Sequence, residues 1–179
     1  MRYVGVLILG MALLGVGTSL GHTAAKPDDR IGEAGHIAVP HDGTELIGTR
    51  APDWDVMDWV NSPPLSLEQL RGRVVLLRWW TGPECPYCSA SAPALNVLQE
   101  VYGARGLTVI GFYHHKSLTP LTRQHVEQLI QQYQFQFPVA IDAQWRTLTQ
   151  WWLNQHPKGW TSISVLLDQS AAATPGASS

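Results

Sequence analysis

Hydrophobic residues form a continuous run over residues 74–80, interrupted only by Arg78. The length of this run and its β-branched start predict a strand buried at the centre of a sheet. Shorter or similar apolar runs over residues 107–113, 138–141 and 162–167 predict three further strands. We expect Arg78 either to reach a solvent edge or to pair with a carboxylate, and the sequence leaves both outcomes open.

Apolar positions between these strands recur at the spacing of a helix. Helices are expected over residues 86–102, 121–133 and 145–152. Pro86 suits the first turn of its helix, because the amide that proline lacks has no partner inside a helix at that position. The alternation of strands and helices predicts a parallel α/β core with right-handed crossovers.

The first residues have the pattern of a targeting signal. Arg2 precedes a stretch that is almost wholly apolar or glycine over residues 4–16, and small residues follow up to Ala25. This pattern predicts a signal peptide over residues 1–25 and a periplasmic or other extracytoplasmic location. The apolar stretch is shorter than the roughly 20 residues of a membrane span. We therefore expect cleavage, with retention as a membrane tether as the alternative.

The rest of the 179-residue chain is expected to form one domain, since 45% of all residues are hydrophobic. Residues 26–46 are rich in Gly, His, Pro and charge and predict a flexible linker. Residues 47–168 form the predicted domain, and the small, polar residues 169–179 predict a disordered tail. The net charge of -2, without a run of like charges, argues against a nucleic-acid partner.

The only two cysteines, Cys85 and Cys88, lie three positions apart where a predicted strand gives way to a predicted helix. A pair this close cannot close a large loop, which indicates a functional role. Unsatisfied amides and the helix dipole favour the thiolate of Cys85, the attacking species in disulfide exchange. Cys88 would then resolve the mixed disulfide. No second cysteine pair completes a zinc site, so we expect neither metal nor cofactor beyond the redox-active disulfide.

Three neighbours are expected to tune this pair. The carboxylate of Glu84 disfavours the adjacent thiolate by like-charge repulsion. Pro86 stiffens the turn, and Tyr87 adds bulk without charge. The sequence therefore predicts a redox site at residues 84–88 but does not fix its reduction potential.

The chain resembles the thioredoxin-like TlpA/ResA group of exported, membrane-associated thiol reductases over roughly residues 47–168. The resemblance is carried by residues 48–53, 67–77, 79–80, 93–95, 106–111 and 137–139 together with the cysteine pair. It implies a thioredoxin-like fold, in which helices flank a central mixed sheet, and dithiol–disulfide exchange with protein substrates. It also implies an upstream electron donor and a role in cytochrome c maturation or in thiol repair outside the cytoplasm.

The chain departs from this pattern in three places. The connection from Trp80 to Cys85 is one residue longer, with Glu84 where an aromatic is usual. Thr161 or Ser162 stands where the group places a cis-proline; with Trp80, these two residues are expected to line the substrate groove. The usual last strand and C-terminal helix are lacking, so we expect residues 163–167 to form an exposed apolar edge.

Three alternative functions remain open. Soft thiolates bind Cu(I), and His114 or His115 would add a ligand in a copper chaperone. A peroxiredoxin-type peroxidase needs Thr or Ser three residues before its cysteine, where Gly82 precedes Cys85. A non-catalytic family member is the third alternative, because the usual C-terminal elements are lacking.

Overall fold

The computed structural model describes residues 1–8, 43–157 and 159–169 and contains one mixed sheet. Its strands run in the order β1-β6-β3-β4-β5-β2. β3, β4 and β5 are parallel, whereas β1, β6 and β2 are each antiparallel to their neighbours. The bounds are β1 Tyr3–Ile8, β2 Trp59–Val60, β3 Val74–Trp80, β4 Leu107–Tyr113, β5 Val139–Ile141 and β6 Ile163–Leu167.

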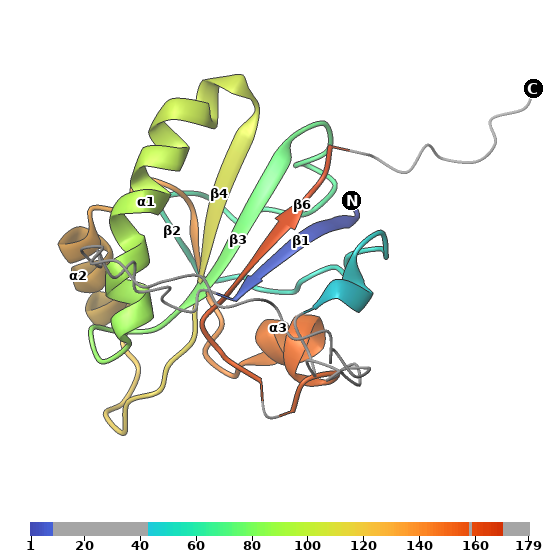
Figure 1. Ribbon diagram of the computed structural model, residues 1–179. Helices are drawn as coiled ribbons and strands as arrows, with labels where there is room; N and C mark the ends of the chain where they lie inside the picture. The colour runs from blue at the N-terminus through green and yellow to red at the C-terminus, as the bar shows by residue number, and fades with distance from the viewer. Residues whose placement is uncertain (9–42, 158, 170–179) are drawn as a thin grey trace, which may run out of the picture. The chain divides into compact units, whose positions relative to one another are not determined.

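Helices lie on both faces of this sheet (Figure 1). α1 and α2 cover one face, and α3, continued by a π-helical turn, covers the other. The bounds are α1 Pro86–Tyr102, α2 Arg123–Tyr133, α3 Arg146–Leu148, the π-helical turn Thr149–Leu153 and 3₁₀ turns at Thr44–Leu46 and Gly103–Arg105. The strands predicted at 74–80 and 107–113 and the helix predicted at 86–102 are confirmed at both ends.

Side chains of β3 alternate between two hydrophobic cores, as a strand covered on both faces requires. Trp79 belongs to the core on the α3 side, where its ring stacks on Phe112 with centroids 5.0 Å apart. Trp80 belongs to the core under α1 and α2, where its ring meets Tyr113 edge to face at 5.0 Å. By the same alternation Arg78 lies on the α1 side of the sheet.

The outer edge of β6 is covered by β1, which pairs with it from Tyr3 to Ile8. Tyr3 is buried, and its ring meets Trp151 at 5.5 Å. The expectation of an exposed edge at β6 is therefore wrong in this structure, because residues assigned by sequence to the signal peptide supply the neighbouring strand. No strand or helix follows β6 as far as residue 169, where the described chain ends.

Other parts of the predicted organisation fall mostly outside the described residues. These parts are the signal peptide from residue 9 on, the linker up to residue 42 and the tail from residue 170 on. The end of the linker is described and forms the 3₁₀ turn at Thr44–Leu46, with Leu46 buried in the core.

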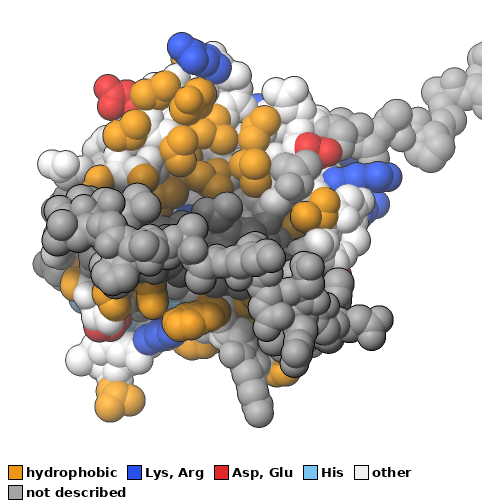
Figure 2. Space-filling model, viewed as in Figure 1, with side chains coloured by type: hydrophobic (Ala, Val, Ile, Leu, Met, Phe, Trp, Pro, Cys, Tyr) orange, Lys and Arg blue, Asp and Glu red, His pale blue; other side chains and the backbone are white. Residues whose placement is uncertain are grey.

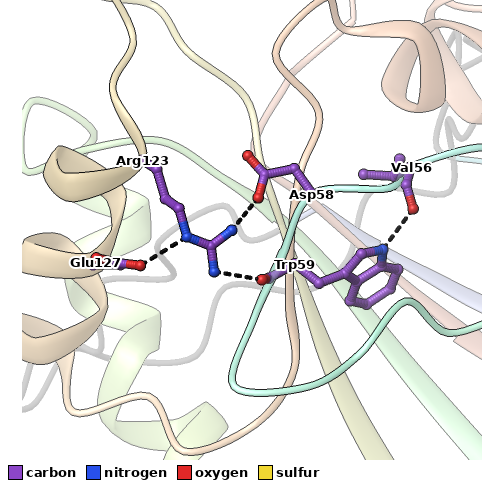
Figure 3. Close-up of polar contacts among 5 residues, drawn as sticks. All are labelled: Val56, Asp58, Trp59, Arg123 and Glu127. Atoms are coloured by element: carbon purple, nitrogen blue, oxygen red, sulfur yellow. Dashed lines mark hydrogen bonds and ion pairs between the residues drawn. The ribbon is translucent and has the colours of Figure 1, made fainter.

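Arg123, the first residue of α2, holds the segment that leads into β2 (Figure 3). Its guanidinium pairs with the carboxylates of Asp58 and Glu127 and donates to the carbonyl of Trp59 at 2.8 Å. The indole of Trp59 donates in turn to the carbonyl of Val56 at 2.6 Å. The two-residue edge strand is thereby fixed to the helix beside it.

Hydrophobic side chains also gather on the surface, on the upper part of the face drawn in Figure 2, where Figure 1 places the end of α1. The exposed apolar residues of α1 include Val97, Val101 and Tyr102. None of the helices in the described parts of the chain combines the length and the hydropathy needed to cross a bilayer.

Candidate active site

Cys85 and Cys88 form a disulfide at the amino end of α1, with their Cα atoms 5.3 Å apart. Cys85 is the N-cap residue, and its sulfur accepts a hydrogen bond from the amide of Cys88 at 3.3 Å. Pro86 occupies the first turn, as predicted. Seventeen residues of helix follow the cap, so the sulfur of Cys85 lies at the positive end of a helix dipole, which favours its thiolate.

The two cysteines differ in exposure. The side chain of Cys88 is buried with only 3% of its surface accessible, whereas Cys85 is half-buried. An incoming disulfide therefore reaches Cys85 first. Exposure makes Cys85 the more accessible sulfur, and the division of roles between an attacking and a resolving cysteine stays a prediction.

The carboxylate of Glu84 is directed back into the loop before the helix. It accepts hydrogen bonds from the hydroxyl of Thr81 at 3.0 Å and the amide of Gly82 at 3.2 Å. Partial burial raises the pKa of Glu84, but hydrogen bonds from its own amide, Thr81 and Gly82 outweigh this effect and hold the pKa below its ordinary value. Glu84 is thus ionised at neutral pH and stabilises the loop on which Cys85 is mounted.

Ser162, in the segment before β6, faces both sulfurs. Its Oγ lies 3.4 Å from Sγ of Cys88 and 3.7 Å from Sγ of Cys85. Disulfide sulfurs carry no hydrogen, so the serine hydroxyl is the donor in this state. Of the two residues predicted at the position of the cis-proline, Ser162 contacts the redox pair, and no peptide bond of the described residues is cis.

A groove of about 310 Å³ opens beside Cys85. It brings together most of the predicted site residues: Glu84, Cys85, Pro86, Tyr87, Thr161 and Ser162. Lys116 and Trp160 also line it, and no local pattern in the sequence predicts either of them as a site residue. The exposed ring of Trp160 meets Tyr87 edge to face at 5.7 Å and gives the groove an aromatic wall.

Trp80, predicted to line the same groove, lies elsewhere. Its ring is buried among Tyr113, Tyr133 and Phe135 at centroid distances of 5.0 to 5.8 Å. As the last residue of β3 it points into the core under α1 and α2, and the four-residue loop from Thr81 to Glu84 separates it from the cysteines. Its role in the structure is packing.

Arg78 does not reach solvent, and no carboxylate among the described residues pairs with it, so neither sequence-based expectation is met in this part of the chain. Its side chain is fully buried behind the cysteine pair. It donates to the hydroxyls of Ser162 at 2.7 Å, Ser91 at 3.1 Å and Ser164 at 3.4 Å, and to the carbonyl of Tyr87 at 3.3 Å. Burial lowers the pKa of Arg78 to about 10, which leaves the guanidinium charged at neutral pH.

The sequence pattern of the AhpC/TSA family matches residues 47–170, which is more than half of the chain. The chain belongs to the AhpC/TSA family. Its thioredoxin-like fold is shared by the thioredoxin-like superfamily protein SPOA0173, with a TM-score of 0.53, 22% identity and coverage of 66% of this chain and 79% of that one. A putative thiol:disulfide interchange protein DsbE from Chlorobium tepidum aligns with a TM-score of 0.52, 23% identity and coverage of 66% and 75%. The predicted fold is confirmed.

Among curated relatives, the thiol-disulfide oxidoreductase ResA of Bacillus cereus (strain ZK / E33L) is 32% identical over 96 residues, 54% of this chain and 51% of the relative. Protein DipZ of Mycobacterium tuberculosis (strain CDC 1551 / Oshkosh) is 29% identical over 120 residues, 65% of this chain and 16% of the relative. The chain thus spans about half the length of the ResA proteins that it matches. The resemblance stated from the motifs is confirmed.

The two histidines considered as copper ligands in this AhpC/TSA member have different surroundings, and the ring nitrogens of His114 have no hydrogen-bond partner among the described residues. His114 is buried with its ring 5.0 Å from that of Trp145. The ring nitrogens of His115 lie 2.9 Å from the hydroxyl of Tyr113 and 2.6 Å from the carbonyl of Thr119. Within the described residues, no three His, Cys, Asp or Glu side chains are grouped to hold a metal ion.

Proposed function

We propose that this chain is an extracytoplasmic thiol–disulfide oxidoreductase that reduces disulfides of other proteins through Cys85 and Cys88. The observation that carries the proposal is the asymmetric pair: a half-buried sulfur at a helix amino end, beside a groove, with a buried partner sulfur behind it. The names of the ResA relatives support the same chemistry.

The reaction balances within the pair. The thiolate of reduced Cys85 attacks one sulfur of a substrate disulfide, forms a mixed disulfide and releases the other substrate sulfur as a thiolate, which takes a proton from water. Cys88 then loses its proton and attacks Cys85, which closes the intramolecular disulfide and releases the second substrate thiol. Two electrons pass to the substrate, and a dithiol donor must return two to the pair for the next cycle.

The groove supports a polypeptide as the substrate. Tyr87 and Trp160 place an aromatic surface beside Cys85, and Lys116 adds a positive charge to the wall. In an extended substrate peptide, the residue next to the substrate cysteine would pack on this aromatic surface. Aromatic surfaces of this kind supply contact area at low entropic cost.

Export is proposed from the leader-like pattern of residues 1–25, with a membrane tether if this segment is retained; in either case the exported domain would lack the pairing of β1 with β6. The biological process is proposed from the resemblance alone: cytochrome c maturation or repair of thiols outside the cytoplasm. The partners are then protein disulfides and an upstream electron donor.

The proposal is tested by trapping the mixed disulfide with oxidised insulin as substrate. The Cys88→Ser variant lacks the resolving thiol, so its covalent complex with an insulin chain should accumulate. Addition of dithiothreitol should reduce the mixed disulfide and release the insulin chain. The Cys85→Ser variant is the matched control and should form no complex. Absence of the complex in Cys88→Ser, together with no acceleration of insulin reduction by the native chain, would reject the proposal.

The alternative functions predict different results in the same preparation. A peroxidase would consume hydrogen peroxide with turnover. A copper chaperone would bind one Cu(I) and lose it on His114→Ala. The proposed oxidoreductase reduces insulin and does neither at a comparable rate or stoichiometry.

A further inference from the structure

Arg78 is a buried cation whose partners are all neutral. It is fully inaccessible to solvent, and among the described residues each acceptor it contacts is a hydroxyl or a carbonyl oxygen. Burying a charge without a counter-charge is costly. A negative charge that appears nearby in one functional state would offset this cost in that state.

Two short routes connect the guanidinium to the redox pair. In the first, Nη2 donates to Oγ of Ser162 at 2.7 Å, and this Oγ lies 3.4 Å from Sγ of Cys88 and 3.7 Å from Sγ of Cys85. In the second, the same nitrogen contacts Ser91, whose hydroxyl donates to the carbonyl of Cys88 at 3.1 Å. The first route reaches the sulfurs themselves, whereas the second reaches only the backbone.

We propose that Arg78 is a positioning residue that acts through the Ser162 hydroxyl to stabilise the thiolate of the reduced pair. It thereby lowers the pKa of the attacking thiol and raises the reduction potential above that of the same pair without the cation. This inference rests on the proposed function and adds to it a residue that sets the reduction potential of the Cys85–Cys88 pair.

The physical basis is the difference in charge between the two redox states. The disulfide is neutral, whereas the dithiol ionises at one sulfur by releasing a proton to water. A nearby cation and a donated hydrogen bond both favour the ionised form, and stabilising the reduced state makes a pair a stronger oxidant. Because the Ser162 oxygen accepts from Arg78, its own proton becomes a better donor to sulfur.

The other charged groups around the pair are placed differently. The carboxylate of Glu84 is turned toward Thr81 and Gly82. Lys116 lines the exposed groove, where solvent and salt screen its charge. Burial lowers the pKa of His114 to about 3, so this ring adds no charge at neutral pH. Within the described residues, Arg78 is the buried cation linked to the sulfurs by a hydroxyl.

Two measurements on the full chain test this inference. The first is the thiol pKa of the reduced pair, followed by thiolate absorbance near 240 nm, and the second is the equilibrium with glutathione. In Arg78→Met we expect the thiol pKa to rise by about one unit. We also expect the equilibrium constant for oxidation of the pair by glutathione disulfide to increase about tenfold, equivalent to a reduction potential about 30 mV lower. Arg78→Lys should recover part of both shifts.

A matched serine pair keeps the test independent of how well Arg78→Met folds. Ser162 and Ser164 both accept from Arg78, but only Ser162 contacts the sulfurs. Ser162→Ala should shift the thiol pKa and the potential in the direction of Arg78→Met, whereas Ser164→Ala should leave both near the native values.

The inference is overturned if the native thiol has an ordinary cysteine pKa near 8.5, or if Ser162→Ala moves neither quantity. If the native chain reduces insulin but the variants have the native thiol pKa and reduction potential, the role of Arg78 is rejected and the proposed function stands. A native chain that forms no disulfide would reject both.

Discussion

Oγ of Ser162 lies 3.4 Å from Sγ of Cys88. This contact brings the segment before β6 against the first turn of α1 and closes off the inner sulfur from solvent. Only 3% of the Cys88 surface is accessible. The two sulfurs of one four-residue motif therefore have unequal access to reagents.

We expect iodoacetamide to alkylate Cys85 at least about tenfold faster than Cys88 in the reduced protein at neutral pH, because Cys85 is both more exposed and favoured as a thiolate. Peptide mapping by mass spectrometry after short exposures measures both rates. Denatured protein is the control, in which the two rates should converge. Equal rates in the folded protein would contradict the assigned order of attack.

His114 should make the folded state sensitive to acid. Burial, reinforced by the positive charges of Lys116 and Arg78, lowers its pKa from 6.5 to about 3. The unfolded chain therefore binds a proton at His114 below pH 6.5 that the folded chain does not bind until about pH 3. The free energy of unfolding should fall as the pH falls through this window, by about 2 kcal/mol at pH 5 from this residue.

The measurement is urea unfolding of the native chain and His114→Leu between pH 4 and pH 7. Below pH 6.5 the native chain should lose stability faster than the variant does. Parallel curves for the native chain and His114→Leu would show that His114 does not titrate as argued.

Tyr3→Ala tests whether β1 belongs to the folded domain. Tyr3 is buried against Trp151, and truncating a buried aromatic ring typically costs about 3 kcal/mol or more. The exposed Tyr102 provides the matched control, with an expected loss below about 1 kcal/mol in Tyr102→Ala. Similar small losses in both variants, measured by denaturant unfolding of the full chain, would show that β1 does not contribute to stability.

Gly111→Ala should destabilise the centre of the sheet. A Cβ at this position would lie 2.9 Å from Nε1 of Trp80 and 3.3 Å from Cγ2 of Val139. Overpacking of this kind costs about 1 to 3 kcal/mol. Gly5→Ala is the control, because a Cβ there meets nothing within 4 Å. A Gly111→Ala variant as stable as the native chain would mean that this packing is looser than described.

The elements that the sequence predicted best are those whose signal is local. Apolar runs identified residues 74–80 and 107–113 as strands, because a strand covered on both faces must be apolar along its whole length. The cysteine pair was likewise placed at a helix start by its neighbours in sequence. Local patterns sufficed wherever the structural constraint acts within one element.

The relationships that the sequence did not predict join residues far apart. The partners of Arg78 include Ser162, 84 positions away, and no local pattern indicates that three serines replace a carboxylate around a buried guanidinium. Trp80 was expected in the groove, whereas strand alternation directs it into the core. The pairing of β1 with β6 was missed because an apolar segment at the start of a chain has the same composition as a leader peptide.

The central claim is that Cys85 and Cys88 form a reversible two-electron couple in the folded protein. It is tested most directly by equilibrating the full chain over a series of ratios of reduced to oxidised glutathione. The free thiols are then alkylated, and the mass of the protein is measured by mass spectrometry. The account predicts one transition between a doubly alkylated and an unmodified form, absent from Cys85→Ser and Cys88→Ser. Two alkylated cysteines at every ratio would contradict it.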